Sequence, residues 1–194
     1  MGRPLMLVVA GPPGSGKTTY FPVTAFGVDS FNIDDRCAQV LGSYRAISRD
    51  VRRAVAQECE RFVRDHIERG LGFAVETTLR TTASIEQAVL AKTRGFSTHL
   101  RFIATDSVGE NISRVLQRAQ GGGHGASERD IRAIHEASIA NLPRALDVFE
   151  RVRVYDSTAP WTTPRLVATA RDRRITRHGP SPAWFEGVLS VLPT

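Results

Sequence analysis

The segment 11–18, which reads GPPGSGKT, constrains the fold of this chain more than any other feature. It matches the phosphate-loop pattern GxxxxGK followed by Ser or Thr at every fixed position, and it directly follows the apolar run 5–10. Glycines let successive backbone N–H groups point at one phosphate, and the helix that begins after the loop adds its positive N-terminal end. An apolar run that leads straight into such a loop predicts a buried parallel strand, and therefore an α/β protein.

The loop also assigns side chains to a nucleotide. Lys17 is expected to reach the β- and γ-phosphates of ATP, and the Thr18 hydroxyl is expected to bind Mg²⁺. An ordinary glycine-rich turn is the alternative, and the complete match between a strand and a helix argues against it. ATP and Mg²⁺ are thus the expected cofactors. The expected ATP-binding residues are Gly11, Pro12, Pro13, Gly14, Ser15, Gly16, Lys17, Thr18 and Thr19.

Strand-like and helix-like segments alternate along the rest of the chain. Ser48 and Gly70 bound one amphipathic segment as N-cap and C-terminal stop, and Ser84 with Gln87 forms a capping box for another. This alternation predicts a P-loop NTPase fold of three layers, with a central, mostly parallel sheet and helices on both faces. The expected strands after 5–10 are 30–35, 71–76, 98–104 and 152–156, and the expected helices include 48–69, 109–120 and 127–149.

The whole chain, 1–194, is predicted to be a single kinase-sized domain. Its core spans about 5–156, and an extension of about 157–194 forms a hairpin and a short helix packed on the core. The loop alone leaves open a switch, a motor or a kinase. The short chain and the acids at an early strand end favour a small kinase.

Composition narrows the partners and the compartment. The net charge is +6, but the basic residues are 24 Arg and 2 Lys, and no basic run is interleaved with aromatics. This argues against a nucleic-acid surface. The two cysteines, Cys37 and Cys59, have no metal-binding spacing. The run 5–10 is too short for a signal peptide or a membrane span, so a cytoplasmic protein without membrane contact is expected.

Acidic residues follow two of the predicted strands, and the carboxyl ends of parallel strands gather at one edge of a sheet. Asp34 is a candidate catalytic base for an acceptor hydroxyl, and it is also a candidate Mg²⁺ ligand beside Thr18. A helix N-cap is the alternative interpretation of Asp34, and for the neighbouring Asp35 the cap is the favoured one. In the segment 75–82, VETTLRTT, two hydroxyls and a guanidinium beside a carboxylate suit a phosphorylated ligand, and a Thr-rich turn is the alternative.

Arginines precede a glycine-rich segment further along the chain. Arg114 and Arg118 lie one helical turn apart, just before the segment 121–125, GGGHG. An arginine that closes over the site would neutralise charge on the transferred phosphoryl group. A solvated basic helix is the alternative, and His124 could pack in the loop or contact the ligand.

Taken together, these stretches resemble the zeta toxin family, small P-loop kinases whose best-known members phosphorylate UDP-N-acetylglucosamine on a sugar hydroxyl. The resemblance runs from about residue 5 to about residue 156. It rests on GPPGSGKTT, NIDD, VETTLRTT, the RGF before a strand, RVLQR followed by GGGHG, and HEASIANLP at 135–143. The ordered set of motifs is much more specific than the phosphate loop alone.

The resemblance implies roles for the matching residues. It makes Asp34 the catalytic carboxylate and Arg118 the arginine that binds the γ-phosphate. It places Glu60, Glu76, Thr78 and Arg80 in the pocket of the sugar nucleotide, although helical periodicity alone predicts an exposed Glu60. The family also has a second lid arginine, for which Arg114, Arg129 and Arg132 compete. Ala126-Ser127 replaces the family's usual Val-Pro, and the loops between 34 and 48 are shorter than in the sugar-nucleotide kinases.

Three functions remain open at this point. The first is a Mg·ATP-dependent kinase of a small phosphorylated metabolite, with a nucleotide sugar as the leading acceptor and a separate antitoxin protein as a partner that the family implies. The second is a nucleotide, polynucleotide or antibiotic kinase. The third is an ATP-binding regulatory module that transfers no phosphate.

Overall fold

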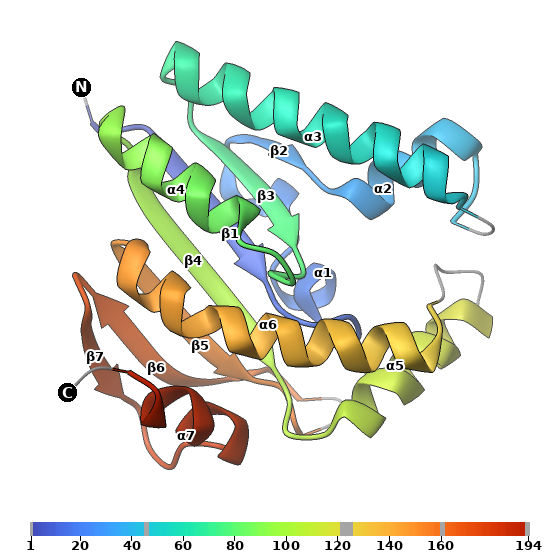
Figure 1. The fold of residues 1–194 in the computed structure, drawn as a ribbon, viewed down its shortest axis with the longest axis vertical. Coiled ribbons are helices and arrows are strands. Elements are labelled where there is room, and N and C mark those ends of the chain that lie inside the picture. The colour runs from blue at the N-terminus through green and yellow to red at the C-terminus, as the bar shows by residue number, and fades with distance from the viewer. Residues whose placement is uncertain (1, 45–46, 121–125, 160–161, 193–194) are drawn as a thin grey trace.

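A computed structural model describes residues 2–44, 47–120, 126–159 and 162–192 of the chain. The predicted glycine-rich segment with His124 lies outside these ranges. The elements, in chain order, are β1 (Leu5–Ala10), α1 (Lys17–Tyr20), the 3-10 helix η1 (Val23–Phe26), β2 (Asp29–Phe31), α2 (Ile33–Leu41), α3 (Arg49–Arg69), β3 (Phe73–Thr77), α4 (Ala83–Thr93), β4 (Ser97–Ala104), α5 (Val108–Gln120), α6 (Glu128–Val148), β5 (Arg151–Asp156), β6 (Arg165–Arg171), β7 (Arg174–Arg177) and α7 (Ala183–Ser190), as Figure 1 shows.

The strands form one seven-stranded sheet with the order β2-β3-β1-β4-β5-β6-β7. The first five strands in this order are parallel, whereas β6 and β7 are antiparallel to their neighbours. Val9 of β1 lies in register with Glu76 of β3. The carboxyl ends of the parallel strands therefore meet at the edge where the phosphate loop begins, as parallel pairing requires.

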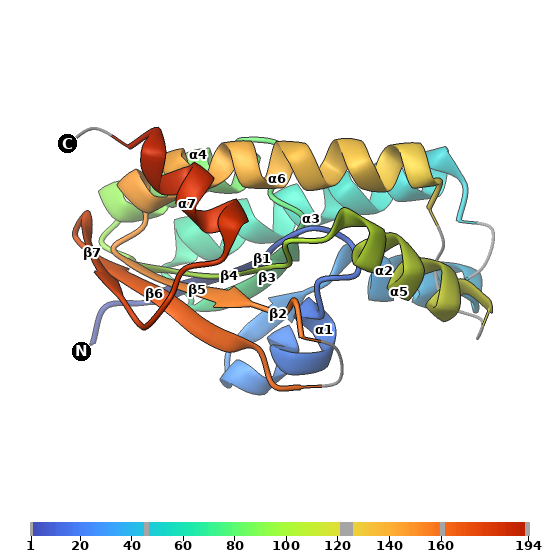
Figure 2. The same cartoon turned by 90° about the horizontal axis from the view of Figure 1, so that it is seen from below.

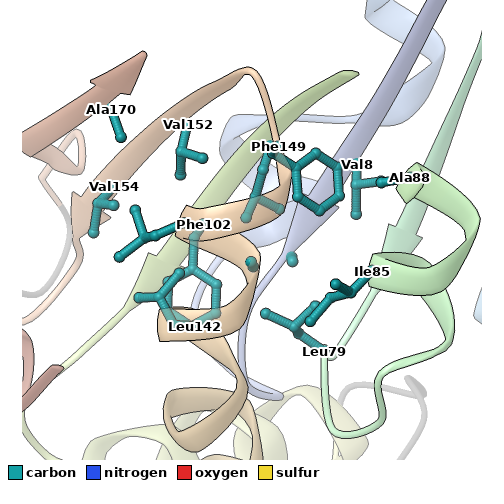
Figure 3. Packing of buried hydrophobic residues seen from close by; sticks show 14 of the residues in the cluster. Val8, Leu79, Ile85, Ala88, Phe102, Leu142, Phe149, Val152, Val154 and Ala170 are labelled. Carbon is teal, nitrogen blue, oxygen red and sulfur yellow. The ribbon is translucent and has the colours of Figure 1, made fainter. Parts of the chain in front are cut away.

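The helices cover the two faces of the sheet very unequally (Figure 2). The helices α3, α4, α6 and α7 pack on one face, and the hydrophobic core lies between them and the strands. Figure 3 shows part of this core, where Leu142 of α6 lies near Phe102 of β4 and Ile85 of α4 lies near Leu79. On the other face, α1 and η1 shelter the smaller cluster around Leu7 and Val9. The predicted fold class is confirmed.

Local signals set most element boundaries. The Ser48 hydroxyl accepts a hydrogen bond from the Val51 N–H at 3.2 Å, and Gly70 ends the same helix in the left-handed conformation. Ser127 caps α6 through the Asp130 N–H in the same way. The helix α3 begins and ends where its predicted caps place it, and α6 begins directly after Ser127, as predicted.

Some predicted boundaries differ from the structure by one or two residues, and at two helices the residue at the N-cap differs from the predicted one. The second strand ends at Phe31 rather than continuing to 35, because the Asn32 side chain accepts hydrogen bonds from the N–H groups of Asp34 and Asp35 and starts α2. Asp34 is therefore in the first turn of a helix and is not its cap. The cap of α4 is Thr82, whose hydroxyl bonds to Glu86, while the predicted cap Ser84 is buried inside the helix.

The segment after β5 is built into the same core as the rest of the chain. The strand β6 pairs with β5, and Phe185 and Val188 of α7 are buried in the cluster that α4 and α6 form with the sheet. Among the described residues, no helix is both long enough and apolar enough to cross a membrane.

Candidate active site

The phosphate loop leaves β1 and turns tightly into α1. Gly14 has φ +76°, and a Cβ atom there would lie 2.5 Å from the carbonyl oxygen of Asn111 on α5. Gly11 has φ +145°, and its Cβ would lie 2.0 Å from the carbonyl oxygen of Ile103. Both positions therefore need glycine for conformational and steric reasons. The loop is pressed against β4 and α5, which hold its shape.

Lys17 lies inside the turn of this loop. Its ammonium donates hydrogen bonds to the carbonyl oxygens of Gly11 at 2.9 Å and Pro12 at 3.0 Å, and its side chain is buried. Burial has the largest effect and lowers the pKa of Lys17, while the carboxylates of Glu76 and Asp34 act in the opposite direction. Both acids are therefore close enough to Lys17 for their charges to matter, and a phosphate would give the ammonium the counter-charge that burial demands.

Thr18 and Glu76 meet where α1 begins and β3 ends. The Thr18 hydroxyl donates to the Glu76 carboxylate, at 2.9 Å from Oε2. Burial raises the pKa of Glu76, while Lys17 and the hydrogen bond from Thr18 lower it. This carboxylate thus lies at the phosphate loop, in contact with the predicted Mg²⁺ ligand Thr18. Its predicted role in the acceptor pocket did not require that contact.

Asp34 faces the same space from the first turn of α2. Its carboxylate accepts a hydrogen bond from Arg52 of α3 at 3.0 Å, and both residues line the pocket. The neighbouring Asp35 accepts a hydrogen bond from the Tyr44 hydroxyl at 2.9 Å, and this bond raises the pKa of Tyr44. Asp35 is outside the pocket lining, so the geometry separates a pocket-facing acid from a structural one.

One large pocket, of about 1080 Å³, lies over the carboxyl ends of the strands. It extends from the phosphate loop, between α3 and α4 on one side and α5 on the other. All the predicted catalytic and acceptor-binding residues line it, whereas Gly11, Pro12 and Ser15 of the loop are buried beneath its surface. The lining residues from the predicted set are Pro13, Gly14, Gly16, Lys17, Thr18, Thr19, Asp34, Glu60, Glu76, Thr78, Arg80 and Arg118.

The turn after β3 has an unusual backbone conformation, which determines which of its side chains face the core and which face the pocket. Leu79 is fully buried in the core although its φ is +58°, a region that an L-residue with a bulky side chain rarely occupies. Asn141 of α6 donates to the carbonyl oxygen of Leu79 at 2.9 Å, and the Ser138 hydroxyl donates to that of Thr78. With Leu79 turned into the core, Thr78 and Arg80 on either side of it line the pocket.

Sequence reasoning assigned no role to Ser138 and Asn141. The signal that could have found them was the segment HEASIANLP, which contains both polar side chains one turn apart on a helix. Arg52 was also missed, because nothing in its sequence neighbourhood distinguishes it from the other arginines of α3.

The arginines of α5 hold different positions in the pocket. Arg118 lines it, and its charge contributes to lowering the pKa of Lys17. Arg114 also lines it, donating to Glu110 at 3.1 Å, to the Ser157 carbonyl at 3.0 Å and to the Gly14 carbonyl at 3.4 Å. Arg129 and Arg132 do not contribute to the lining as far as the described residues define it, and Arg132 pairs with Glu128 at 2.6 Å. Of the three candidates for a second lid arginine, Arg114 alone is thus placed at the phosphate loop.

The donor set at the loop fits Mg²⁺. This ion usually binds phosphate-transfer sites through one or two protein oxygens together with the phosphates. The paired oxygens of Thr18 and Glu76, with Asp34 close by, supply such donors. Within the described ranges, the structure contains no group of three His, Cys, Asp or Glu residues arranged to hold a metal without a nucleotide.

A parallel sheet whose central strand leads into a phosphate loop, with a charged pocket beyond it, defines a P-loop protein of the kinase-like class. Within that class, the zeta toxin family model matches residues 1–160, and the chain belongs to the zeta toxin family. An uncharacterized protein of Haemophilus influenzae (strain ATCC 51907 / DSM 11121 / KW20 / Rd) is 29% identical over 124 residues, which are 61% of this chain and 83% of that protein.

Solved structures share the fold over nearly the whole chain. One comes from the PezAT chromosomal toxin-antitoxin system of Streptococcus pneumoniae, with a TM-score of 0.65 and 19% identity, covering 98% of this chain and 85% of that chain. Another is the AvrRxo1-ORF1:AvrRxo1-ORF2 complex with ATP, with a TM-score of 0.69 and 18% identity, covering 97% of this chain and 63% of that chain. At these identities the likeness shows the fold.

Proposed function

We propose that this protein is a Mg·ATP-dependent kinase that transfers the γ-phosphoryl group to a hydroxyl of a small phosphorylated metabolite. A nucleotide sugar such as UDP-N-acetylglucosamine is the first acceptor to test, because the family resemblance points to it. The observation that carries the proposal is the convergence of Lys17, Glu76 and Asp34 at one end of a single pocket. These residues supply a phosphate-binding cation, an acid at the metal site and an acid for the acceptor.

In the proposed reaction, the acceptor hydroxyl lies beside Asp34 and gives its proton to that carboxylate. The acceptor oxygen forms a bond to the γ-phosphorus as the bond to the bridging oxygen of ADP breaks. Lys17 and Arg118 hold the phosphate oxygens while their charge shifts. When Mg²⁺ is bound through Thr18 and Glu76, it neutralises charge on the β- and γ-phosphates.

Arg52 has a positioning role in this proposal. Its 3.0 Å contact with Asp34 holds the carboxylate toward the pocket from the side of α3.

The rest of the pocket suits a polar, charged acceptor. Besides Asp34, the pocket is lined by Glu60 on α3 and by Thr78 and Arg80 in the turn after β3. Carboxylate and hydroxyl groups can pair with sugar hydroxyls, and a guanidinium can pair with a phosphate that the acceptor already carries. The presence of these three side chains in one pocket supports a phosphorylated acceptor over a neutral one.

A separate antitoxin protein is the proposed regulator. The support is family membership together with the PezAT structure, whose own description names a toxin-antitoxin system. Inhibition of turnover by a protein encoded beside this one would test the idea directly, and an unrelated small protein serves as the control.

The experiment that tests the kinase is ADP release with Mg·ATP against a panel of acceptors, with Lys17→Ala as the blank. The panel holds UDP-N-acetylglucosamine, other nucleotide sugars, nucleotides, 5′-hydroxyl oligonucleotides and hydroxylated antibiotics. Turnover on nucleotide sugars supports the whole proposal. Turnover on another class of acceptor would support the kinase function but would replace the proposed acceptor. ATP binding without turnover on any acceptor would contradict the proposed kinase function and would favour a regulatory module that binds ATP.

A further inference from the structure

One face of the sheet is uncovered on the side of β5 to β7. Val152, Val154 and Ala170 point into the core beneath α6, so the alternation of side chains along a strand sends their neighbours to the opposite face. On that opposite face, α1 and η1 lie under the part of the sheet around β1 (Figure 2). Of the described residues, none forms a helix beneath β5, β6 and β7.

Arginines occupy this uncovered face in rows that run across the strands. In the first row, Arg151 of β5 is the register partner of Arg171 of β6, and Arg171 is the partner of Arg174 of β7. In the second row, Arg101 of β4 is the register partner of Arg153 of β5. We call these residues the arginine face: Arg101, Arg151, Arg153, Arg171 and Arg174.

The pairing places like charges directly opposite one another, which destabilises a sheet. The acids close to this face are few. Arg171 is 3.8 Å from Asp172, and Glu150 is paired with Arg3 at 2.6 Å. Arg101 lies over the rings of Phe21 and Phe26, at 5.2 and 4.6 Å from their centroids.

The other arginines of this face also have few acidic residues near them. In the described part of the chain, Arg151, Arg153 and Arg174 form no ion pair, and all three are exposed. Burial lowers the pKa of His99, the register partner of Arg151, and the charges of Arg151, Arg153 and Arg101 lower it further, while Glu150 opposes them. The acids near this face, Asp172 and Glu150, are thus fewer than the arginines that the strand register brings together.

The members of the arginine face are five of the 26 basic residues of the chain. The five arginines are spread over residues 101–174 and form no basic run interleaved with aromatics, so the sequence argued against a nucleic-acid surface. The strand register gathers them on one side of one sheet.

We propose that the arginine face binds the sugar-phosphate backbone of a single-stranded nucleic acid. Guanidinium groups pair with phosphates through two parallel hydrogen bonds, and release of counterions drives such binding without any apolar contact. A protein partner needs a desolvated apolar or aromatic centre, whereas the exposed positions of this face are arginine and threonine. A second copy of the chain would place arginine against arginine.

The shape of the face favours a flexible strand over a duplex. The first row crosses β5, β6 and β7, whose neighbouring backbones are about 4.8 Å apart, so its cations follow one another closely on a twisted surface. A single strand can bend to lay successive phosphates along it. A duplex is stiff over far longer distances and would touch only a small part of the row.

This surface is independent of the proposed kinase site. The lining of the pocket includes none of the five arginines. Loss of nucleic-acid binding with intact turnover, or the reverse, therefore separates this proposal from the proposed function.

The test is fluorescence anisotropy of a labelled single-stranded RNA of mixed sequence, titrated with the full chain at several salt concentrations. Phosphate contacts from the four exposed arginines of this face predict a slope of log K against log salt of about −2.8. The double variant Arg151→Gln/Arg153→Gln is expected to reduce the magnitude of this slope by about 1.4 and to weaken binding at low salt about tenfold. The matched control is Arg64→Gln/Arg144→Gln, which removes the same charge from exposed positions on α3 and α6 and is expected to bind like the wild type.

A folding control accompanies the titration. The Arg151→Gln/Arg153→Gln variant removes cross-strand repulsion, so its thermal midpoint is expected to equal or exceed that of the wild type. The proposal is overturned if the wild type shows no saturable binding, or if both double variants weaken binding equally. It is also overturned if a duplex of the same sequence, an acidic polypeptide or vesicles of anionic lipid bind more tightly than the single strand.

Discussion

Thr18 and Glu76 are 58 residues apart in sequence, and the hydroxyl of the first donates a 2.9 Å hydrogen bond to the carboxylate of the second. The contact joins the first turn of α1 to the end of β3, because β1 and β3 run side by side in parallel register. It brings a carboxylate to the position where a P-loop hydroxyl binds Mg²⁺. Two measurements on Glu76 follow from it.

Glu76→Gln is expected to stabilise the protein without Mg²⁺ and ATP while impairing its activity. Burial raises the pKa of Glu76, so the folded state binds a proton more tightly than the unfolded chain does. The stability of the wild type therefore falls as pH rises from the ordinary range of a glutamate toward the folded pKa. Thermal unfolding at a series of pH values should show similar midpoints at low pH and a growing advantage for the variant as pH rises.

The same variant should need about 10–100 times more Mg²⁺ for half-maximal turnover. Glu86→Gln on the surface of α4 is the control, and it should change neither the Mg²⁺ requirement nor the pH profile of unfolding. An unaltered Mg²⁺ requirement in Glu76→Gln would exclude this carboxylate from the metal site.

Asp34→Asn is expected to keep ATP binding and to lower turnover by roughly 10²–10⁴-fold, because the amide cannot accept the proton of the acceptor hydroxyl. The ion pair with Arg52 is about one-third exposed on both sides, at 35% and 38%, so its loss should change the free energy of unfolding by only about 0–1 kcal/mol. Asp35→Asn is the matched control, since Asp35 bonds to Tyr44 outside the pocket. Full turnover in Asp34→Asn would rule out Asp34 as the base.

The sequence predicted the parts of the site that depend on short stretches of chain. The phosphate loop, the caps Ser48 and Ser127 and the pocket position of Arg80 all follow from residues that are close together in sequence. The boundary at Asn32 was missed because three residues compete there for the role of cap, and side-chain geometry decides among them. The arginine face could not be predicted either, since it depends on which strands are neighbours and in what register.

Asn141→Ala is expected to destabilise the protein and to weaken acceptor binding together. The substitution leaves the carbonyl of buried Leu79 without its donor, which should cost about 1–3 kcal/mol of the free energy of unfolding. Leu79 would then be less firmly held in its left-handed conformation, and Thr78 and Arg80 would lose their fixed direction. Urea unfolding and the acceptor KM measure the two effects. A variant that is destabilised but has a normal acceptor KM would show that the turn keeps its shape without Asn141.

Arg80→Ala is expected to raise the acceptor KM about 10–100-fold and to leave ATP affinity unchanged, because a charge-assisted hydrogen bond to a phosphate contributes about 1.5–3 kcal/mol. Arg80 is exposed and lines the pocket, so its removal should barely alter stability. Arg94→Ala, at the far end of α4, removes the same side chain from outside the pocket and should behave as the wild type. If Arg80→Ala weakens ATP binding instead, the guanidinium belongs to the donor phosphates, and the wall that it shares with Glu60 and Thr78 would have to accommodate an acceptor without a phosphate of its own.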